Sequence, residues 1–494
     1  TYPQQTEVEL DYWVDSSAGV RAQGYTLNTT RFKTLLEQQT GIRIKFIHPP
    51  TWQASQNFEL MIASNDLPDI IEYNWSDYEG GAEKAIGDNV IIDLKPIMDK
   101  VSPNLKQFLD ERPEIAKNLL TDQGQYGYYP SIRDGDVLTV FRGAMVRKDL
   151  LDQAGLSAPE TIQEWDTALR TFKQMGVEIP LTVNLNNYML DNVGPFLGAF
   201  DLCGGFYQEN GKVKFGPYED NFALFAKQMR AWYAEGLLDS EFTNVDAGRY
   251  ELLLAEGKVG FLFGTAGGDM GNWVPIVQQN NPNTTLVPVK YPAANKGGRS
   301  KFGHRVLPIS GMGAAISTQC RDVEIAARLL DYAYSDAGHM LYNFGEEGVS
   351  YQMVDGYPQY TPIMINPQLN GGKTMQEMLA QFTREGNIGP YVQDARYIEQ
   401  YYNLDVQKEA LQLWADTDTE QYQLPFLTLT LEENTEYSTI MKKIDSYRQE
   451  TLYQYIVGLL PENAMEDYFV QLQNMGIERV IEIEQAAYDR FLER

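Results

Sequence analysis

Short apolar strands alternate with helical segments through the first third of the chain, and this alternation constrains the fold more than any other feature. Residues 8–14 show the period of two that is typical of a half-buried strand, and residues 42–47, 69–71 and 90–92 predict further strands. Strands that alternate with helices predict a parallel sheet covered by helices on both faces. Sheets of this kind bind ligands beyond the carboxyl ends of their strands.

A second αβ region follows residues 126–130. It holds a predicted strand at 137–146, a helix that begins with a capping box at 161–164, and a buried strand at 259–263. From Asp405 onward the pattern is largely helical. Because a single hydrophobic core rarely grows beyond about 250–300 residues, a chain of 494 residues is predicted to fold as two lobes.

The composition excludes several classes of function. The formal net charge of −28 comes without a cluster of Lys and Arg, which argues against binding to nucleic acid or to anionic membranes. Cys203 and Cys320 lack the spacing of a metal or redox motif and are expected to be buried free thiols, and three scattered histidines predict no His-based metal centre. No apolar run is long enough to span a bilayer. The chain begins at Thr1 without a Met or a basic leader, so we expect a mature fragment whose export signal was removed.

Six segments, in order along the chain, resemble one family: the large LplA-like lipoproteins among the family 1 extracellular solute-binding proteins of carbohydrate ABC importers. They are Asn65–Ile70; Asp122–Gly127 with Pro130; Val146–Leu151 with Gly155–Leu156, Pro159–Thr161 and Glu164–Trp165; Trp232–Asp239; Gly345–Tyr351; and Ala486–Phe491. The matches span almost the whole chain, and six matches in the right order are hard to obtain by accident.

The resemblance implies an α/β, two-lobed, periplasmic-binding-protein-like (type II) fold with hinge-crossing strands and a helical C-terminal region. We expect residues 1–130 with 306–360 to form the N-terminal lobe, and residues 131–305 with 361–494 to form the C-terminal lobe. It also implies a monomer at the cell surface, with a lipid anchor whose signal and Cys are absent from this sequence. Such proteins deliver an oligosaccharide ligand to the transmembrane subunits of an ABC permease and catalyse nothing.

Many relatives in the family carry a calcium loop, and this chain departs from that pattern. The corresponding segment, residues 172–181, has a single carboxylate, whereas calcium requires six to eight oxygen ligands. Residues 416–420 are acidic but lack the Gly of an EF-hand turn. We therefore expect no metal and no cofactor.

A sugar site needs aromatic rings for the C–H face of a pyranose and planar polar groups for its hydroxyls. Trp13 lies at the carboxyl end of the first strand, and Trp75 follows the strand at 69–71. Trp273 follows the Gly-rich stretch 267–272, read as a loop, where the family often places a sugar-stacking Trp. These three are candidate platforms.

Other candidates come from the expected lobe crossings. Tyr128 and Tyr129 lie on the first crossing, and Tyr351 lies near a later one. Arg305 could hold vicinal hydroxyls or a uronate, and it could equally form a structural salt bridge. Two further candidates are Tyr188 and Tyr397.

These patterns predict a binding protein that closes its lobes on an oligosaccharide. The charge of −28 favours a neutral sugar over an acidic one, although a local Arg can reverse that preference. A carbohydrate-active enzyme is an alternative because sequence spacing cannot reveal a pair of catalytic carboxylates. A binding protein for a non-sugar solute, or one that serves a sensor kinase, is a further alternative.

Overall fold

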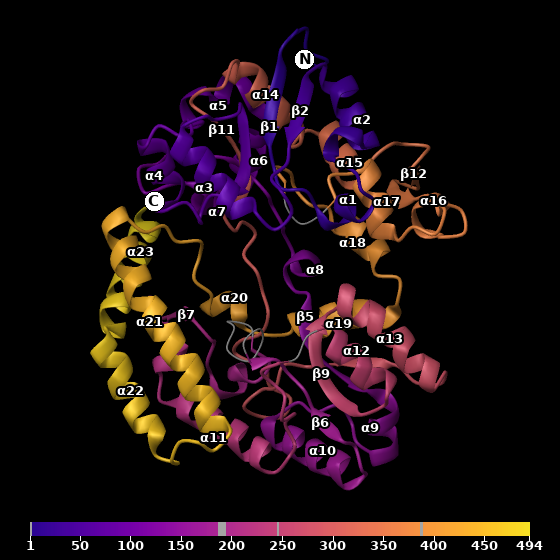
Figure 1. Cartoon of the computed structure of the whole chain (residues 1–494), viewed down its shortest axis with the longest axis vertical. Helices are drawn as coiled ribbons and strands as arrows, with labels where there is room; N and C mark the ends of the chain where they lie inside the picture. Colours follow the sequence, from indigo (N-terminus) through magenta and orange to yellow (C-terminus); the bar gives the residue numbers. More distant parts are fainter. Residues whose placement is uncertain (1, 186–193, 245–246, 386–388) are drawn as a thin grey trace.

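The chain folds as two lobes, which lie one above the other in Figure 1. The structure is a computed structural model and describes residues 2–185, 194–244, 247–385 and 389–494. Each lobe has its own large hydrophobic core, the upper around the first strands and the lower around residues 138–291 with the C-terminal helices. The two-lobed α/β architecture expected from the sequence is therefore confirmed.

A five-stranded sheet forms the centre of the upper lobe. In the order β2-β1-β3-β11-β4, its strands are Arg43–Ile47, Glu9–Trp13, Ile70–Asn74, Met312–Ile316 and Tyr129–Pro130. The pairs β1–β2 and β1–β3 are parallel, as predicted, but β11 is antiparallel to both β3 and β4. The expectation of a purely parallel sheet is wrong, because β11 enters this sheet from the lower lobe.

Helices cover both faces of this sheet. They are α1 (Ala18–Ala22), α2 (Arg31–Thr40), α3 (Ala54–Ser64), α4 (Gly81–Gly87), α5 (Lys95–Val101), α6 (Pro103–Glu111), α7 (Pro113–Leu119), α14 (Val323–Tyr332), α15 (Asp336–Phe344) and α17 (Met375–Phe382). At one edge of the lobe, α16 (Pro362–Ile365) packs on α17, and the hairpin β12 (Tyr351–Val354) and β13 (Tyr357–Tyr360) packs on α15. In α2, the Thr30 side chain accepts a hydrogen bond from the Lys33 N–H, and Gly41 ends the helix in the left-handed region at φ 72°.

A four-stranded sheet forms the centre of the lower lobe. In the order β10-β5-β9-β6, its strands are Leu286–Val289, Arg142–Arg147, Val259–Thr265 and Ile179–Leu181. Around it lie α9 (Lys148–Ala154), α10 (Ile162–Gln174), α11 (Asn221–Ala234), α12 (Ala247–Ala255), α13 (Gly268–Asn280), α19 (Asp405–Ala415), α20 (Thr419–Tyr422) and the hairpin β7 (Phe206–Glu209) and β8 (Lys212–Phe215). The helix α18 (Ala395–Tyr401) lies at the junction of the lobes, in contact with β13.

Two predicted strands differ from the structure. At 90–92, the Val90 N–H bonds back to Ala85 at the end of α4, so Ile91 forms only an isolated bridge to Ser317. The predicted strand 137–146 is divided, because its start lies in the short helix α8 (Asp136–Thr139) and β5 begins only at Arg142. The Thr139 hydroxyl donates to the Gly135 carbonyl and supports that helical turn.

Within the described residues, three segments cross between the lobes: residues 131–141 (first crossing), 303–309 (second crossing) and 391–395 (third crossing). Backbone hydrogen bonds join the first to the third, where the Ile132 N–H donates to Tyr391 and the Gln393 N–H donates to Ile132. The first and second are joined by the Val306 N–H, which donates to Thr139. The crossings therefore form one hydrogen-bonded bundle between the lobes.

The third crossing comes later in the chain than expected. Residues 361–392 were assigned to the C-terminal lobe, but α17 packs against α1 and α2 of the upper lobe. The Gln23 side-chain amide also donates to the Glu377 carbonyl at 2.8 Å. This assignment is wrong because the apolar side of α17, with Leu379 and Ala380, is buried on the upper lobe.

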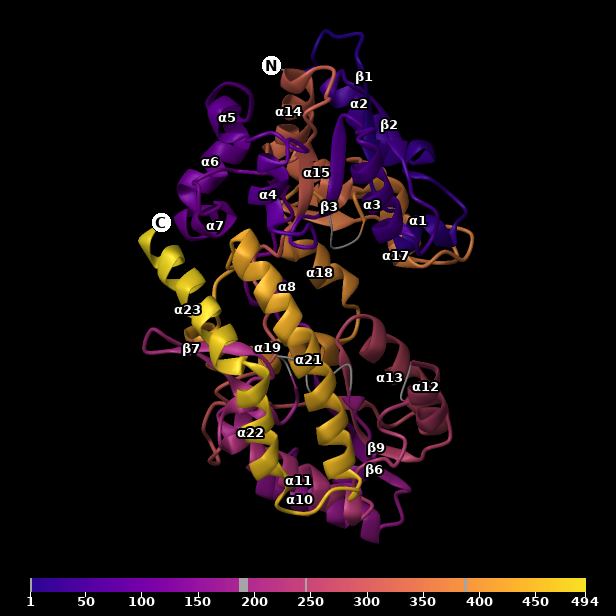
Figure 2. The ribbon, with the colours of Figure 1, turned by 60° about the vertical axis from the view of Figure 1, so that its left-hand side comes forward.

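Three C-terminal helices, here called the helical hairpin, pack on the lower lobe and reach the upper lobe at one end. They are α21 (Leu431–Ile456), α22 (Ala464–Met475) and α23 (Ile477–Glu493), drawn in yellow in Figure 2. α21 contacts α11, and α23 contacts β8. At the upper end, Arg490 and Arg494 both form salt bridges with Asp122, which follows α7.

Both cysteines are free thiols. Cys203 is buried, as expected, whereas Cys320 is partly exposed. None of the helices in the described ranges is long and apolar enough to cross a membrane.

Candidate functional site

A cavity of about 270 Å³ lies where the crossings meet the two lobes. The upper lobe contributes residues of α15 and α17, and the lower lobe contributes the end of β9 and the start of α13. Its aromatic lining residues are Phe141, Tyr342, Tyr391, Tyr397, Tyr401 and Tyr402. Its polar lining residues are Arg133, Thr265, Asn343, Gln376, Thr383, Arg384, Glu385 and Gln393. Rings beside planar polar groups are what a pyranose requires.

A buried ion pair lies on the upper side of this cavity. The Arg384 guanidinium donates to Glu72 at 2.7 Å, and the two side chains are only 3% and 1% exposed. The Tyr12 hydroxyl donates to the other Glu72 oxygen at 2.6 Å. Burial and the Glu72 carboxylate raise the pKa of Tyr12 well above its ordinary value. This network fixes the position of Arg384 against β1 and β3.

Two charged side chains, Arg133 and Glu385, line this cavity. The Arg133 guanidinium lies over the Phe141 ring, 5.8 Å from its centroid, and burial lowers the pKa of Arg133. One carboxylate oxygen of Glu385 is buried without a hydrogen-bond partner among the described residues. Buried polar atoms are costly when they are unpaired. Ligand hydroxyls can therefore bond to this part of the lining.

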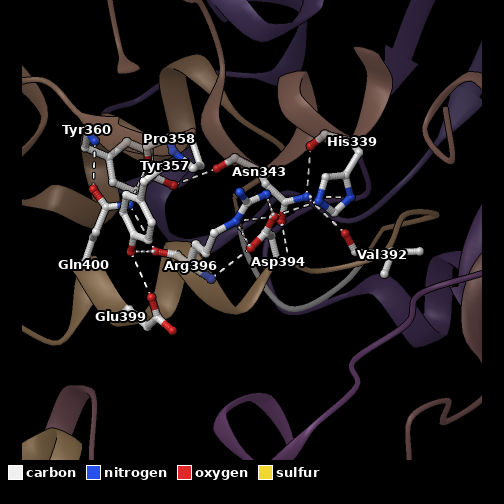
Figure 3. Close-up of polar contacts among 10 residues, drawn as sticks. All are labelled: His339, Asn343, Tyr357, Pro358, Tyr360, Val392, Asp394, Arg396, Glu399 and Gln400. Carbon is white, nitrogen blue, oxygen red and sulfur yellow. Dashed lines mark hydrogen bonds and ion pairs between the residues drawn. The ribbon is translucent and has the colours of Figure 1, made fainter. Parts of the chain in front are cut away.

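A polar cluster fixes the third crossing and the start of α18 (Figure 3). Asp394 caps α18 and accepts hydrogen bonds from His339 at 2.8 Å and from Arg396 at 2.6 Å. Burial alone would raise the pKa of Asp394, but these bonds hold it well below its usual range. The Asn343 amide donates to Val392 and accepts from the Asp394 N–H. The cluster therefore joins α15 to the third crossing.

The β12–β13 hairpin holds the other side of α18, as Figure 3 shows. The Tyr360 hydroxyl donates to the Asn343 carbonyl at 2.6 Å, and the Tyr360 N–H donates to the Gln400 side chain at 2.7 Å. The Tyr357 hydroxyl donates to Glu399 at 2.9 Å. Because α18 carries Tyr397 and Tyr401, these bonds set the aromatic wall of the cavity in place.

The Gly-rich stretch 267–272 was predicted to be a loop, but most of it is helical. Residues 268–272 form the first turns of α13, with Thr265 and Asp269 exchanging hydrogen bonds at its start. Trp273 is therefore part of a helical stripe, is 2% exposed, and packs against Tyr250 at 5.0 Å between ring centroids. The prediction that Trp273 lies on a loop is wrong. It is Thr265, Gly267 and Gly268 that reach the cavity from this region.

Trp13 and Trp75 are also buried in this structure. The Trp13 indole packs against Phe58 and Tyr73 beneath α3, and its N–H donates to Asn57 at 3.0 Å. Trp13 was expected as a platform at the carboxyl end of the first strand, but α3 covers its ring here. Trp75 is fully buried, and its N–H donates to the Gly313 carbonyl.

Of the remaining candidate sugar-binding residues that the structure describes, some are buried away from the cavity and one lines it. Tyr129 is buried and bonds to the Ser102 hydroxyl, and Tyr351 is buried on β12. Arg305 forms a salt bridge with Asp136 at 2.8 Å. Tyr397 lines the cavity. Tyr188 lies outside the described residues.

A second junction cavity of about 210 Å³ lies between α4, α7 and the segment that leads into α21. Trp75 and Tyr128 line it from the upper lobe, and Phe426 and Tyr437 line it from the other side. The structure therefore does not bring the predicted residues into one place: Trp75 and Tyr128 share this second cavity, and Tyr397 lies at the first.

Sequence reasoning missed most of the cavity lining. Tyr401 and Tyr402 lie beside Tyr397 in a Tyr-rich stretch, which is the one local signal that could have drawn attention to them. Arg384 and Gln393 carry no such signal, because their place depends on contacts with Glu72 and with the first crossing.

The described residues hold no group of three or more His, Cys, Asp and Glu side chains placed to bind a metal ion. The acidic segment 416–420 faces cations instead. Arg299 forms salt bridges with both Asp416 and Asp418, and Lys290 pairs with Asp416 at 3.0 Å.

Comparisons with known proteins agree on one family. The sequence model of the bacterial extracellular solute-binding proteins matches residues 25–340, more than half of the chain. The fructooligosaccharide ABC transporter substrate-binding protein FusA of Streptococcus pneumoniae is 26% identical over 490 residues, covering 92% of this chain and 86% of FusA. Lipoprotein LipO of Bacillus subtilis is 26% identical over 344 residues, covering 65% of this chain and 64% of LipO. The solved structure of FusA in complex with kestose superposes with a TM-score of 0.75 at 22% identity, covering 98% of this chain and all of that one.

Proposed function

The chain belongs to the bacterial extracellular solute-binding proteins, and from this membership we infer that it captures an oligosaccharide and delivers it to the permease of an ABC importer. It is a binding protein of a transport system and not an enzyme. FusA, named for its fructooligosaccharide transporter, supports a carbohydrate as the class of ligand. The relative LipO, named a lipoprotein, supports an anchor on the outer face of the membrane. We propose that the protein acts as a monomer.

The observation that carries this proposal is the first cavity, which both lobes line with aromatic rings and planar polar groups. A sugar placed there would contact Thr265 and Gly267 from below and Gln376 and Arg384 from above. Such a ligand makes all of its contacts only when the lobes are close together. Binding would therefore favour the closed arrangement, because a ligand shifts a population toward the state it binds more tightly.

A thermal-shift screen across oligosaccharides of different composition and length tests the proposal. A ligand present at about 100 times its Kd adds roughly 2.7 kcal/mol to the free energy of unfolding, so its melting curve moves clearly. Chromatography of the sugar after incubation should recover it with its length unchanged. Shortened products would instead identify a carbohydrate-active enzyme, and failure of every saccharide to bind would contradict the proposal.

Tyr397→Ala is expected to weaken binding of the identified sugar at least tenfold, about 1.4 kcal/mol, because the cavity loses one aromatic wall. Titration calorimetry measures the change. Tyr453→Ala, which removes a partly exposed Tyr from α21, is the matched control and should leave the Kd unchanged. Equal affinities of the Tyr397 variant and the parent would exclude Tyr397 from the site.

A further inference from the structure

The turn that follows β2 holds a tryptophan in a backbone conformation that large residues rarely adopt. The Gln53 N–H donates to the Pro50 carbonyl at 3.0 Å and closes the turn. Trp52, the residue before Gln53, has φ 65°, in the left-handed region where Gly or Asn is favoured. A bulky side chain is strained there, and strain of this kind is concentrated at functional positions.

The Trp52 side chain is 89% exposed, more than any other large hydrophobic side chain in the described ranges. The Arg21 guanidinium lies over its ring, 5.5 Å from the centroid. Arg21 in turn pairs with Asp15 and donates to the Ser16 carbonyl. One face of the indole is therefore backed by a fixed cation. The opposite face is open to solvent, which is the arrangement of a prepared stacking surface.

This tryptophan lies on the side of the upper lobe that faces the lower lobe. Arg21 belongs to α1, which packs on α17, and α17 supplies Gln376 and Leu379 to the first cavity. In Figures 1 and 2, α1 and α17 both face α12 and α13 across the junction. Gly19 of α1 lies against the cavity lining, because a Cβ built there would meet the Gln376 carbonyl and the Glu385 carboxyl carbon at 3.1 Å each. Arg21, two residues further along α1, backs Trp52, so Trp52 lies one helix width, about 10–12 Å, from the cavity rim. An oligosaccharide of a few units can bridge that distance.

We propose that Trp52 is an outer saccharide platform, which stacks on a sugar unit that extends from the first cavity past α1. The proposal deepens the proposed function and rests on it. A cavity of about 270 Å³ is at the small end of ligand sites, so a chain of several sugars must continue outside it. A solvent-exposed ring whose second face is already occupied suits such a terminal unit.

The test measures the Kd of Trp52→Asn and of the parent for a series of the identified oligosaccharide with increasing chain length, from the shortest member that binds to the longest. We expect about a tenfold rise in Kd for the long members and less than a twofold change for the shortest. Because Asn tolerates a positive φ and the indole packs little, the melting temperature should stay the same or rise. Trp52→Phe should keep most of the affinity for long members. Leu60→Ala, which removes another exposed apolar side chain of the upper lobe, is the matched control and should change nothing.

An unchanged Kd for the Asn variant at every chain length would overturn the proposal. So would normal binding combined with a loss of uptake in cells, because that result would make Trp52 a permease contact. If the parent protein bound no saccharide at all, the proposed function would fail instead, and the two failures can therefore be told apart.

Discussion

Glu72→Gln should lower the free energy of unfolding by about 3–5 kcal/mol, because it leaves the Arg384 guanidinium buried without a counter-charge. Both side chains of the pair are almost completely inaccessible, so water cannot replace the lost carboxylate. Urea denaturation at neutral pH measures the change. Affinity for the sugar should fall as well, because Arg384 lines the first cavity and loses its fixed position.

A double-mutant cycle separates the pair from its surroundings. Glu72→Leu combined with Arg384→Met removes both charges. This double variant should recover most of the free energy of unfolding that Glu72→Leu alone or Arg384→Met alone loses. Tyr12→Phe, which removes only the hydroxyl that donates to Glu72, should cost about 1 kcal/mol. A loss below 1 kcal/mol for Glu72→Gln would show that the pair is not buried in solution.

Acid should destabilise the lobe junction through His304. Burial, together with Arg142, Arg133 and Arg305, lowers the pKa of His304 from 6.5 to about 3. The folded protein therefore keeps His304 neutral while the unfolded chain binds a proton below about pH 6.5. The contribution to stability is complete above that pH and is lost as the pH falls toward 3. At pH 5 the loss is about 2 kcal/mol.

His304→Asn is the comparison that isolates this effect. The Nδ1 atom of His304 accepts a hydrogen bond from the Phe141 N–H at 3.2 Å, and the Asn side-chain oxygen can take over that role without titrating. Between pH 7.5 and pH 5 the parent should lose about 2 kcal/mol more than the variant. His48, whose pKa burial also lowers, titrates in both proteins and cancels in the difference. Parallel stability curves for the two proteins would show that the folded protein does not lower the pKa of His304.

The fold was predictable where local patterns determine it. β1 and β2 were found from alternation over a few residues, β3 from a short apolar run, and the capped helix α10 from its Thr161 cap. The position of β11 could not be found in this way, because it is set by pairing with β3 more than 200 residues earlier in the chain. The same reason placed residues 361–392 in the wrong lobe: α17 looks like any amphipathic helix until its contact with α1 is known.

The site was less predictable than the fold. Trp273 was predicted as a platform because it follows a Gly-rich stretch and because the resembling family often has a sugar-stacking Trp there, but Gly268 and Gly271 lie within a helix here. Tyr391 and Gln393 reach the cavity because backbone bonds tie the third crossing to Ile132. Such long-range bonds leave no local pattern in the sequence.

The salt bridges that Arg490 and Arg494 form with Asp122 have a directional consequence. They join the helical hairpin of the lower lobe to the upper lobe along one edge of the molecule. Bodies that are joined along one edge separate along the opposite edge. The edge opposite the helical hairpin is where α1 and α17 face α12 and α13. A sugar chain would therefore enter between these two pairs of helices.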